Sequence, residues 1–210
     1  MPRLDAAQVR TLLWAGLAVV LAGWNGSILI LELPAVADSF GARVSDLSNL
    51  GSIVVFGALG AWPLATLADR FGRRRLIALG VGLFCLVSLA TPFAPNLTSL
   101  ALMRLAASCF EGLVGGVATA LIVEEAPPAH RGTALSALAL LFGAGQAIPV
   151  VVYPFVAPNW RVLFIAGGLG LIAAPLIWRG LPESRAWRRA HMRWQTASAP
   201  GCRTSRTSAR

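Results

Sequence analysis

Two residues of opposite charge, Arg104 and Glu111, lie within one long apolar stretch of the sequence. Charged groups in such a setting are costly and usually face a cavity, where they bind ions or relay protons. Their spacing of seven places them on one helical face, about 10 Å apart along the axis. We therefore expect no direct pair, but a bridge by a substrate anion, a proton relay or water, with Ser108 between them and Glu111 as the titrating group. A purely structural role in helix packing stays open.

Further polar side chains interrupt the neighbouring apolar stretches. Asn25, Ser27 and Gln146 could line the same cavity, because polar groups in a lipid environment need partners inside the protein. Hydrogen bonds between helices would explain them equally well. Glu32 falls near the end of its apolar stretch, and there we expect it to lie at the membrane interface.

A second cluster of charged residues separates two apolar stretches and contains a glycine. Its members are Asp69, Arg70, Gly72, Arg73 and Arg74. We expect a tight turn at Gly72, with the aspartate at the carboxyl end of one helix and the arginines at the amino end of the next. Both placements are unfavourable against the helix dipoles, so these charges need other partners. Membrane topology alone would explain the arginines, but not the aspartate and the glycine.

The elements that carry these residues are predicted to be membrane-spanning helices. The 210 residues are 56% hydrophobic and only 13% charged, whereas a soluble domain is about a quarter charged. A helix crosses the bilayer with about 20 apolar residues, and a break at residues 91–96 divides the longest apolar run in two. The six predicted spans are 11–33, 47–68, 75–94, 97–123, 133–157 and 161–179. They predict an all-α membrane protein.

Other classes of protein fit the sequence less well. The first apolar run continues to Leu33, beyond the length of a signal-peptide core of about 7–15 residues. Most of the helices are apolar all round, unlike those of a soluble bundle. The net charge of +9 would suit a nucleic-acid binder, but the 18 basic residues are all arginines that follow membrane topology. We expect the lipid bilayer as a partner and no nucleic acid.

The arginines also orient the chain. With the amino terminus inside, only Arg43 and Arg161 fall outside and Arg104 lies within a span, while the other arginines fall inside. This asymmetry follows the positive-inside rule. It predicts a bacterial-type inner (plasma) membrane protein with a cytoplasmic segment 1–10, a transmembrane bundle 11–180 and a cytoplasmic tail 181–210. The tail is rich in Arg, Ser and Thr and is expected to be disordered.

The cluster around Gly72 resembles the cytoplasmic signature of the major facilitator superfamily, usually written G-x-L-A-D-R-x-G-R-R/K. Residues 65–75 read A-T-L-A-D-R-F-G-R-R-R, so Ala65 replaces the first glycine. In that family the aspartate caps a helix of the second half and helps to hold the cytoplasmic gate shut. The resemblance implies this role for Asp69, with Arg73 as its charge-relay neighbour.

Two further segments resemble sugar porters and proton-coupled organic-acid symporters of that superfamily. Arg104, followed by residues 124–132 (E-E-A-P-P-A-H-R-G), resembles their pattern R…E-x-x-P-x-x-x-R-G, which includes Arg131. It makes Glu124 a candidate partner of Arg73, and it associates Arg104 with proton coupling or anion binding. Residues 181–185 (L-P-E-S-R) resemble the P-E-S-P-R motif without its second proline.

The resemblance implies one six-helix half of a transporter, built as a 3+3 inverted repeat. It implies secondary transport of a small polar metabolite, a sugar or an organic acid, by alternating access around a midplane site. Organic-acid symporters commonly have an aspartate near the position of Asn25, so proton coupling stays open. Residues 142–149 lack the G-P-x-x-G-G pattern of drug antiporters, which favours import. We expect neither an enzyme nor a cofactor, because no nucleophile, base or metal-ligating cluster shares a common point.

A complete member of that superfamily has two six-helix halves, which leaves three interpretations of this chain. It pairs with a second copy or a separate second half, it is a truncated or frameshifted product that transports nothing, or it is a membrane scaffold. The missing partner of Asp69 favours pairing, whereas the Ser/Thr/Arg tail favours truncation.

Overall fold

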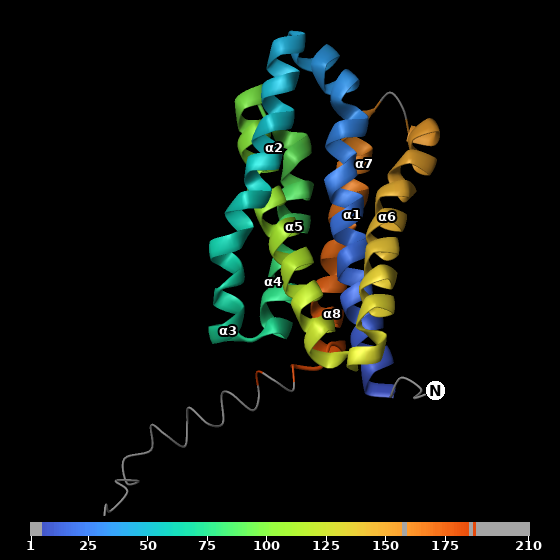
Figure 1. The fold of residues 1–210 in the computed structure, drawn as a ribbon. Coiled ribbons are helices and arrows are strands. Elements are labelled where there is room, and N and C mark those ends of the chain that lie inside the picture. The colour runs from blue at the N-terminus through green and yellow to red at the C-terminus, as the bar shows by residue number, and fades with distance from the viewer. Residues whose placement is uncertain (1–5, 157–158, 185–186, 188–210) are drawn as a thin grey trace, which may run out of the picture.

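The computed structural model describes residues 6–156, 159–184 and 187, without the side chains of some helical residues such as that of Asp69. Of the two segments predicted to be cytoplasmic, 1–10 and 181–210, residues 1–5, 185–186 and 188–210 lie outside the described residues. The described residues form a bundle of long helices that lie side by side (Figure 1).

Every predicted span has a helical counterpart. The helices are α1 (Ala6–Phe40), α2 (Val44–Ala65), α3 (Leu67–Phe71), α4 (Arg73–Ala90), α5 (Leu97–Glu125), α6 (Arg131–Val156), α7 (Trp160–Gly168) and α8 (Ala173–Gly180). Within the described residues, five segments are long and apolar enough to cross a membrane, and α2 contributes a shorter apolar stretch, Leu50–Ala61. The all-α membrane fold predicted from the sequence is confirmed.

Two boundaries differ from the prediction. The first helix continues past residue 33 to Phe40, with Pro34 inside it. The sixth span is not one helix, because a 3₁₀ turn at Leu169–Ile172 separates α7 from α8. Pro175 has no N–H to donate to the carbonyl four residues earlier, and glycines at 167, 168 and 170 weaken the helix just before it.

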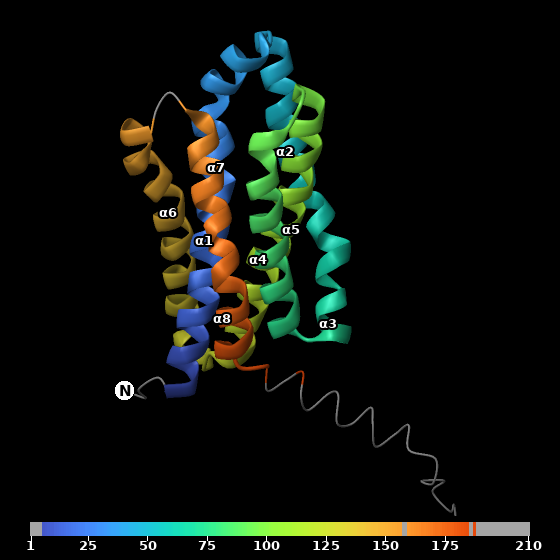
Figure 2. The same cartoon turned by 180° about the vertical axis from the view of Figure 1, so that it is seen from behind.

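The packing of the helices repeats itself between the two halves of the chain. The two most extensive contacts join α1 to α6 and α5 to α2. Helices α1, α2 and α4 are spans one to three, and α5, α6 and the pair α7 and α8 are spans four to six. Each of the two contacts therefore joins the first span of one triplet to the second span of the other. Helix α4 packs against α7 and α8, the third span against the sixth (Figure 2). This pattern is that of a 3+3 repeat.

Close backbone approach at two glycines holds these equivalent pairs together. A Cβ atom at Gly145 of α6 would overlap the backbone of Val20 in α1, and one at Gly57 of α2 would lie 2.8 Å from the carbonyl oxygen of Leu105 in α5. Helices in membranes associate through such small residues, since lipid supplies no hydrophobic drive between them.

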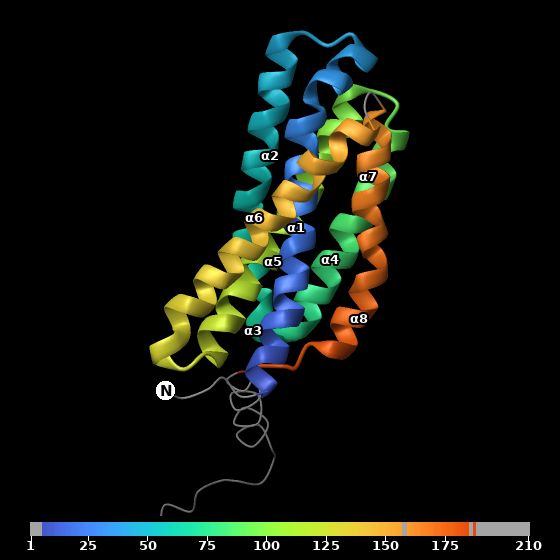
Figure 3. The ribbon, with the colours of Figure 1, turned by 90° about the vertical axis from the view of Figure 1, so that its right-hand side faces the viewer.

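The charged residues divide the bundle into two ends. Helix α1 begins and α8 ends at the same end, where α3 also meets α4 (Figures 1 and 3). We call it the arginine-rich end, defined by Arg10, Arg70, Arg73, Arg74, Arg75, Arg131 and Arg179. Arg43 and Arg161 lie at the opposite end, before α2 and at the start of α7.

Candidate functional site

The turn at Gly72 begins a charged network at the arginine-rich end. Gly72 has φ 91° and ψ 147°, a conformation that glycine adopts readily and other residues avoid. The tight turn expected there is confirmed. A Cβ atom at this position would come within 2.7 Å of Oε2 of Glu183, so the glycine also leaves room for that carboxylate.

Glu183 caps the helix that follows the turn. Its Oε1 accepts hydrogen bonds from the backbone N–H of Arg73 at 2.8 Å and from that of Arg74 at 3.3 Å. These amides are among the N–H groups at the amino end of α4 that have no acceptor within the helix itself. A carboxylate at this end also interacts favourably with the helix dipole. The network therefore ties the segment after the sixth span to the start of the third.

The side chain of Arg73 extends this network to the fourth span. Its Nη2 donates to Oε1 of Glu124 at 2.6 Å, and the two side chains are 13% and 22% exposed. Ser184 donates its hydroxyl to the other oxygen of Glu124. Four residues from three distant segments, Arg73, Glu124, Glu183 and Ser184, thus form one cluster, which we call the clamp.

The remaining residues of the expected gate motif lie around the clamp. Arg70 is exposed, and Asp69 belongs to α3 with a side chain outside the described part of the chain. Arg74 places its guanidinium 5.4 Å from the centre of the Trp178 ring. Arg131 is exposed and donates from Nε to the carbonyl of Ala126 at 3.4 Å. Their roles in a gate stay a prediction.

A second cluster lies inside the bundle, around Arg104. This side chain is fully buried, and its Nη2 donates to the carbonyl of Asn25 at 3.0 Å and to Oε1 of Glu111 at 3.2 Å. The expectation that Arg104 and Glu111 are too far apart to pair is wrong. The axial rise measures the separation of the two backbone positions. The long arginine side chain runs along the helix and spans this separation.

Other expected members of this cluster take different places. Ser108 donates to the carbonyl of Leu105 in its own helix and packs against Gly57 of α2, so it does not bridge the ion pair. Gln146 is exposed on α6, where its backbone carbonyl accepts from Ser27 at 3.3 Å. The side-chain amide of Asn25 donates to the carbonyls of Leu21 and Gly167, at 3.1 and 3.4 Å.

Glu32 is a residue whose environment the sequence misrepresents. It was expected at the membrane interface, but its exposed fraction is 1%. Neither carboxylate oxygen has a hydrogen-bond partner among the described residues. Because α1 continues beyond the predicted end of the span, Glu32 lies two turns inside the helix rather than at its end.

Glu183 and Ser184 lie within the segment that resembles the P-E-S-P-R motif, and the sequence predicts no role for either. The signal was present, because a helix that opens with three arginines at its positive end requires a nearby acid. Nothing local could identify that acid, since it follows Arg73 by 110 residues.

Comparison with known proteins identifies the family. The model of the Major Facilitator Superfamily matches residues 13–200. The chain belongs to this superfamily. Its sequence is 36% identical over 191 residues to a 3-(3-hydroxy-phenyl)propionate transporter of Escherichia coli, which covers 86% of the chain and 46% of the relative. It is 33% identical over 180 residues to the niacin transporter NiaP of Acinetobacter baylyi, covering 83% and 40%.

Solved structures of the superfamily share the fold. The inward-open xylose transporter XylE of E. coli superimposes with a TM-score of 0.76 at 18% identity, over 92% of this chain and 53% of that one. A bacterial homologue of the human lysosomal transporter Spinster gives 0.71 at 19%, over 87% and 44%. The chain spans less than half the length of the curated superfamily relatives described above.

Proposed function

We propose that this chain forms the amino-terminal half of a secondary transporter that moves a small organic acid by alternating access. The observation that carries the proposal is the state of Arg104. Its Nη2 is engaged, but its Nε and Nη1 are buried without a hydrogen-bond partner among the described residues. A buried donor without a partner is costly, and a carboxylate is a strong acceptor for a guanidinium N–H, because both groups are charged.

The relatives support an acid over a sugar. Besides the two transporters named above, the chain resembles proteins described as a gallate transporter and as a 4-hydroxybenzoate transporter, with 29% and 31% identity. Gallate and 4-hydroxybenzoate are both aromatic carboxylates. The xylose transporter shares only 18% identity and supports the fold alone. We therefore favour an aromatic acid as the substrate.

The clamp provides one side of a cytoplasmic gate in this proposal. It holds spans three, four and six together, so that Asp69 and Arg70 stand at a fixed place beside it. Their partner would be a helix of a second six-span unit, contributed by another polypeptide segment or a second copy. The arginine-rich end then faces the cytoplasm of a plasma membrane, with both ends of the chain on that side.

Binding to the purified chain in lipid nanodiscs tests the substrate class. We expect 4-hydroxybenzoate and 3-(3-hydroxyphenyl)propionate to produce heat in calorimetric titrations, whereas xylose produces none. Arg104→Gln abolishes the signal, while Arg161→Gln, which removes an arginine at the outer end, leaves it unchanged. A signal that survives Arg104→Gln removes the basis of the proposal.

Uptake tests the coupling to protons. We propose Glu111 as the titrating group, because it is the acid that pairs with Arg104. Proteoliposomes that contain the chain together with a second half should take up the acid in response to an inward proton gradient. Glu111→Gln should abolish the response to the gradient and preserve exchange of labelled for unlabelled acid. Unchanged gradient-driven uptake would refute the role of Glu111.

A further inference from the structure

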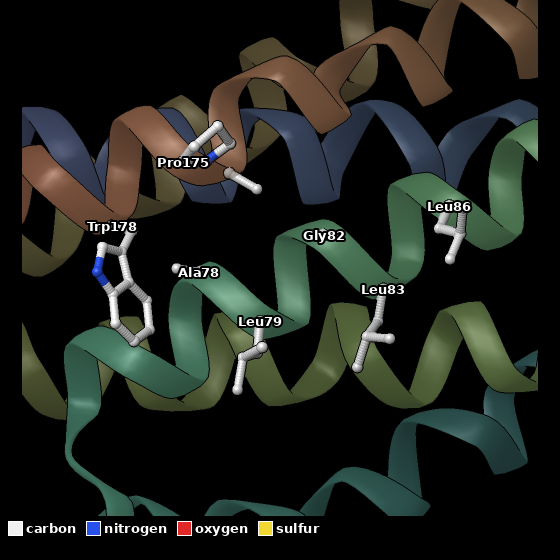
Figure 4. Close-up of a pocket in the computed structure, with 8 residues that line it drawn as sticks. Ala78, Leu79, Gly82, Leu83, Leu86, Pro175 and Trp178 are labelled. Atoms are coloured by element: carbon white, nitrogen blue, oxygen red, sulfur yellow. The ribbon is translucent and has the colours of Figure 1, made fainter.

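An apolar groove of about 350 Å³ runs along the outside of the bundle between α4 and α8. Helix α4 supplies one wall and α8 the other, and Trp178 extends from α8 toward α4 at one end (Figure 4). The lining residues are Ala78, Leu79, Gly82, Leu83, Leu86, Ala174, Pro175 and Trp178.

The shape of the groove suits a hydrocarbon chain. Leu79 and Leu86 are each 54% exposed, so their side chains stand on the rim instead of filling the hollow. Gly82 leaves the middle of the α4 wall without a side chain, and a Cβ atom there would make ordinary contacts with Ala174 at 3.7 Å and Leu171 at 4.0 Å. Both helices belong to segments that are long and apolar enough to span a membrane, and the apolar lining of the groove suits contact with lipid.

One end of the groove is positively charged. Arg74 lies over the Trp178 ring at 5.4 Å, and its Nε is buried without a hydrogen-bond partner among the described residues. Arg75 and Arg179 are exposed at the same end. Glu183 offsets part of this charge, but its Oε1 is engaged by the backbone N–H groups of α4.

We propose that this groove binds one anionic phospholipid of the leaflet at the arginine-rich end. An acyl chain lies in the open groove over Gly82 and Ala174, and the phosphate meets Arg74 beside Trp178. The apolar wall selects a lipid, and the charge selects its headgroup, because three arginines repel the amine of a zwitterionic lipid and attract a net negative one. The proposal is independent of the transported substrate.

Native mass spectrometry of the chain, released from detergent with equal amounts of phosphatidylglycerol and phosphatidylcholine, tests the headgroup. We expect one phosphatidylglycerol bound in preference to phosphatidylcholine. Arg74→Gln weakens this binding about fivefold, which corresponds to about 1 kcal/mol for one basic residue near a headgroup. Arg74→Lys restores most of it. The matched control is Arg161→Gln, since Arg161 also lies over a tryptophan, Trp160, at 4.8 Å but at the opposite end.

The groove itself is tested by filling it. Gly82→Leu places a side chain where the acyl chain would lie and should abolish the bound lipid. Gly116→Leu serves as the control, because a side chain at Gly116 meets no atom within 4 Å. Quenching of tryptophan fluorescence by phosphatidylglycerol with brominated acyl chains supplies a second measurement, and the quenching should fall when Trp178 is replaced by Phe.

Three outcomes would overturn the proposal. The first is equal retention of phosphatidylcholine and phosphatidylglycerol by the unmodified chain. The second is an effect of Arg74→Gln no larger than that of Arg161→Gln. The third is lipid binding by Gly82→Leu equal to that of Gly116→Leu. Circular dichroism of each variant shows that the helices are retained, so that loss of binding is not loss of the fold.

Discussion

Replacement of Gly72 by alanine should destabilise the chain through two separable effects. The first is backbone strain, because φ 91° and ψ 147° lie in a region that is nearly confined to glycine and costs about 1–3 kcal/mol for other residues. The second is loss of the Glu183 cap, since the new Cβ would stand 2.7 Å from Oε2 of that carboxylate. Loss of a helix cap costs about 1 kcal/mol. We therefore expect Gly72→Ala to cost about 2–4 kcal/mol.

A double-mutant cycle separates the two effects. Glu183→Ala alone should cost about 1–2 kcal/mol, because two backbone N–H groups lose their acceptor. Added to Gly72→Ala, it should cost almost nothing, since the alanine has already displaced the carboxylate. The free energy of unfolding is measured by circular dichroism during titration of the micelle-bound chain with sodium dodecyl sulfate.

Gly41→Ala provides the control for strain alone. Gly41 has φ 59°, and a Cβ atom there meets nothing within 4 Å. It should cost about 1–2 kcal/mol, the ordinary cost of a left-handed residue, and show no coupling with Glu183→Ala. Strictly additive costs for Gly72→Ala and Glu183→Ala would refute the contact between the turn and the cap.

Three further changes test other contacts. The cycle of Arg73→Gln and Glu124→Gln should give a coupling energy of about 1–2 kcal/mol, measured in the same titration, because the pair is partly exposed and its 2.6 Å bond is charge-assisted; no coupling would mean that the clamp is not formed. Gly145→Ala should lower the melting temperature by forcing α6 away from the backbone of Val20, whereas Gly143→Ala, which meets no atom within 4 Å, should not; equal effects would contradict the close approach. Glu32→Leu should raise the free energy of unfolding by about 1–3 kcal/mol by removing a buried carboxylate that has no hydrogen-bond partner among the described residues, and a loss of stability would point to a partner.

Local sequence properties were sufficient to predict the bundle. Hydropathy located every span because a helix in lipid must be apolar along its length. The turn at Gly72 followed from residue types alone, since a glycine among charged residues between two apolar stretches is typical of a tight turn. The break in the sixth span was missed because Pro175 and the glycines before it lie within a run that remains apolar, and hydropathy does not register a missing hydrogen bond.

The site was harder to predict because its contacts join distant segments. Arg73 and Glu124 were paired by resemblance, not by any property of either residue. The burial of Glu32 and the free nitrogens of Arg104 depend on neighbours from other helices, which residue spacing does not specify. The Arg104–Glu111 pair does not follow from residue spacing, because axial distance does not include the reach of a long side chain.

The pairing of α1 with α6 has a consequence for biogenesis. The ribosome makes α1, the first span, long before α6, the fifth span, so the first helix enters the membrane before the surface that covers it exists. Until then the backbone at Val20 faces lipid or a transient companion. Contacts between elements far apart in sequence form late and slowly. The interval between insertion of the first and fifth spans is therefore the period in which this chain is most exposed to membrane chaperones and proteases.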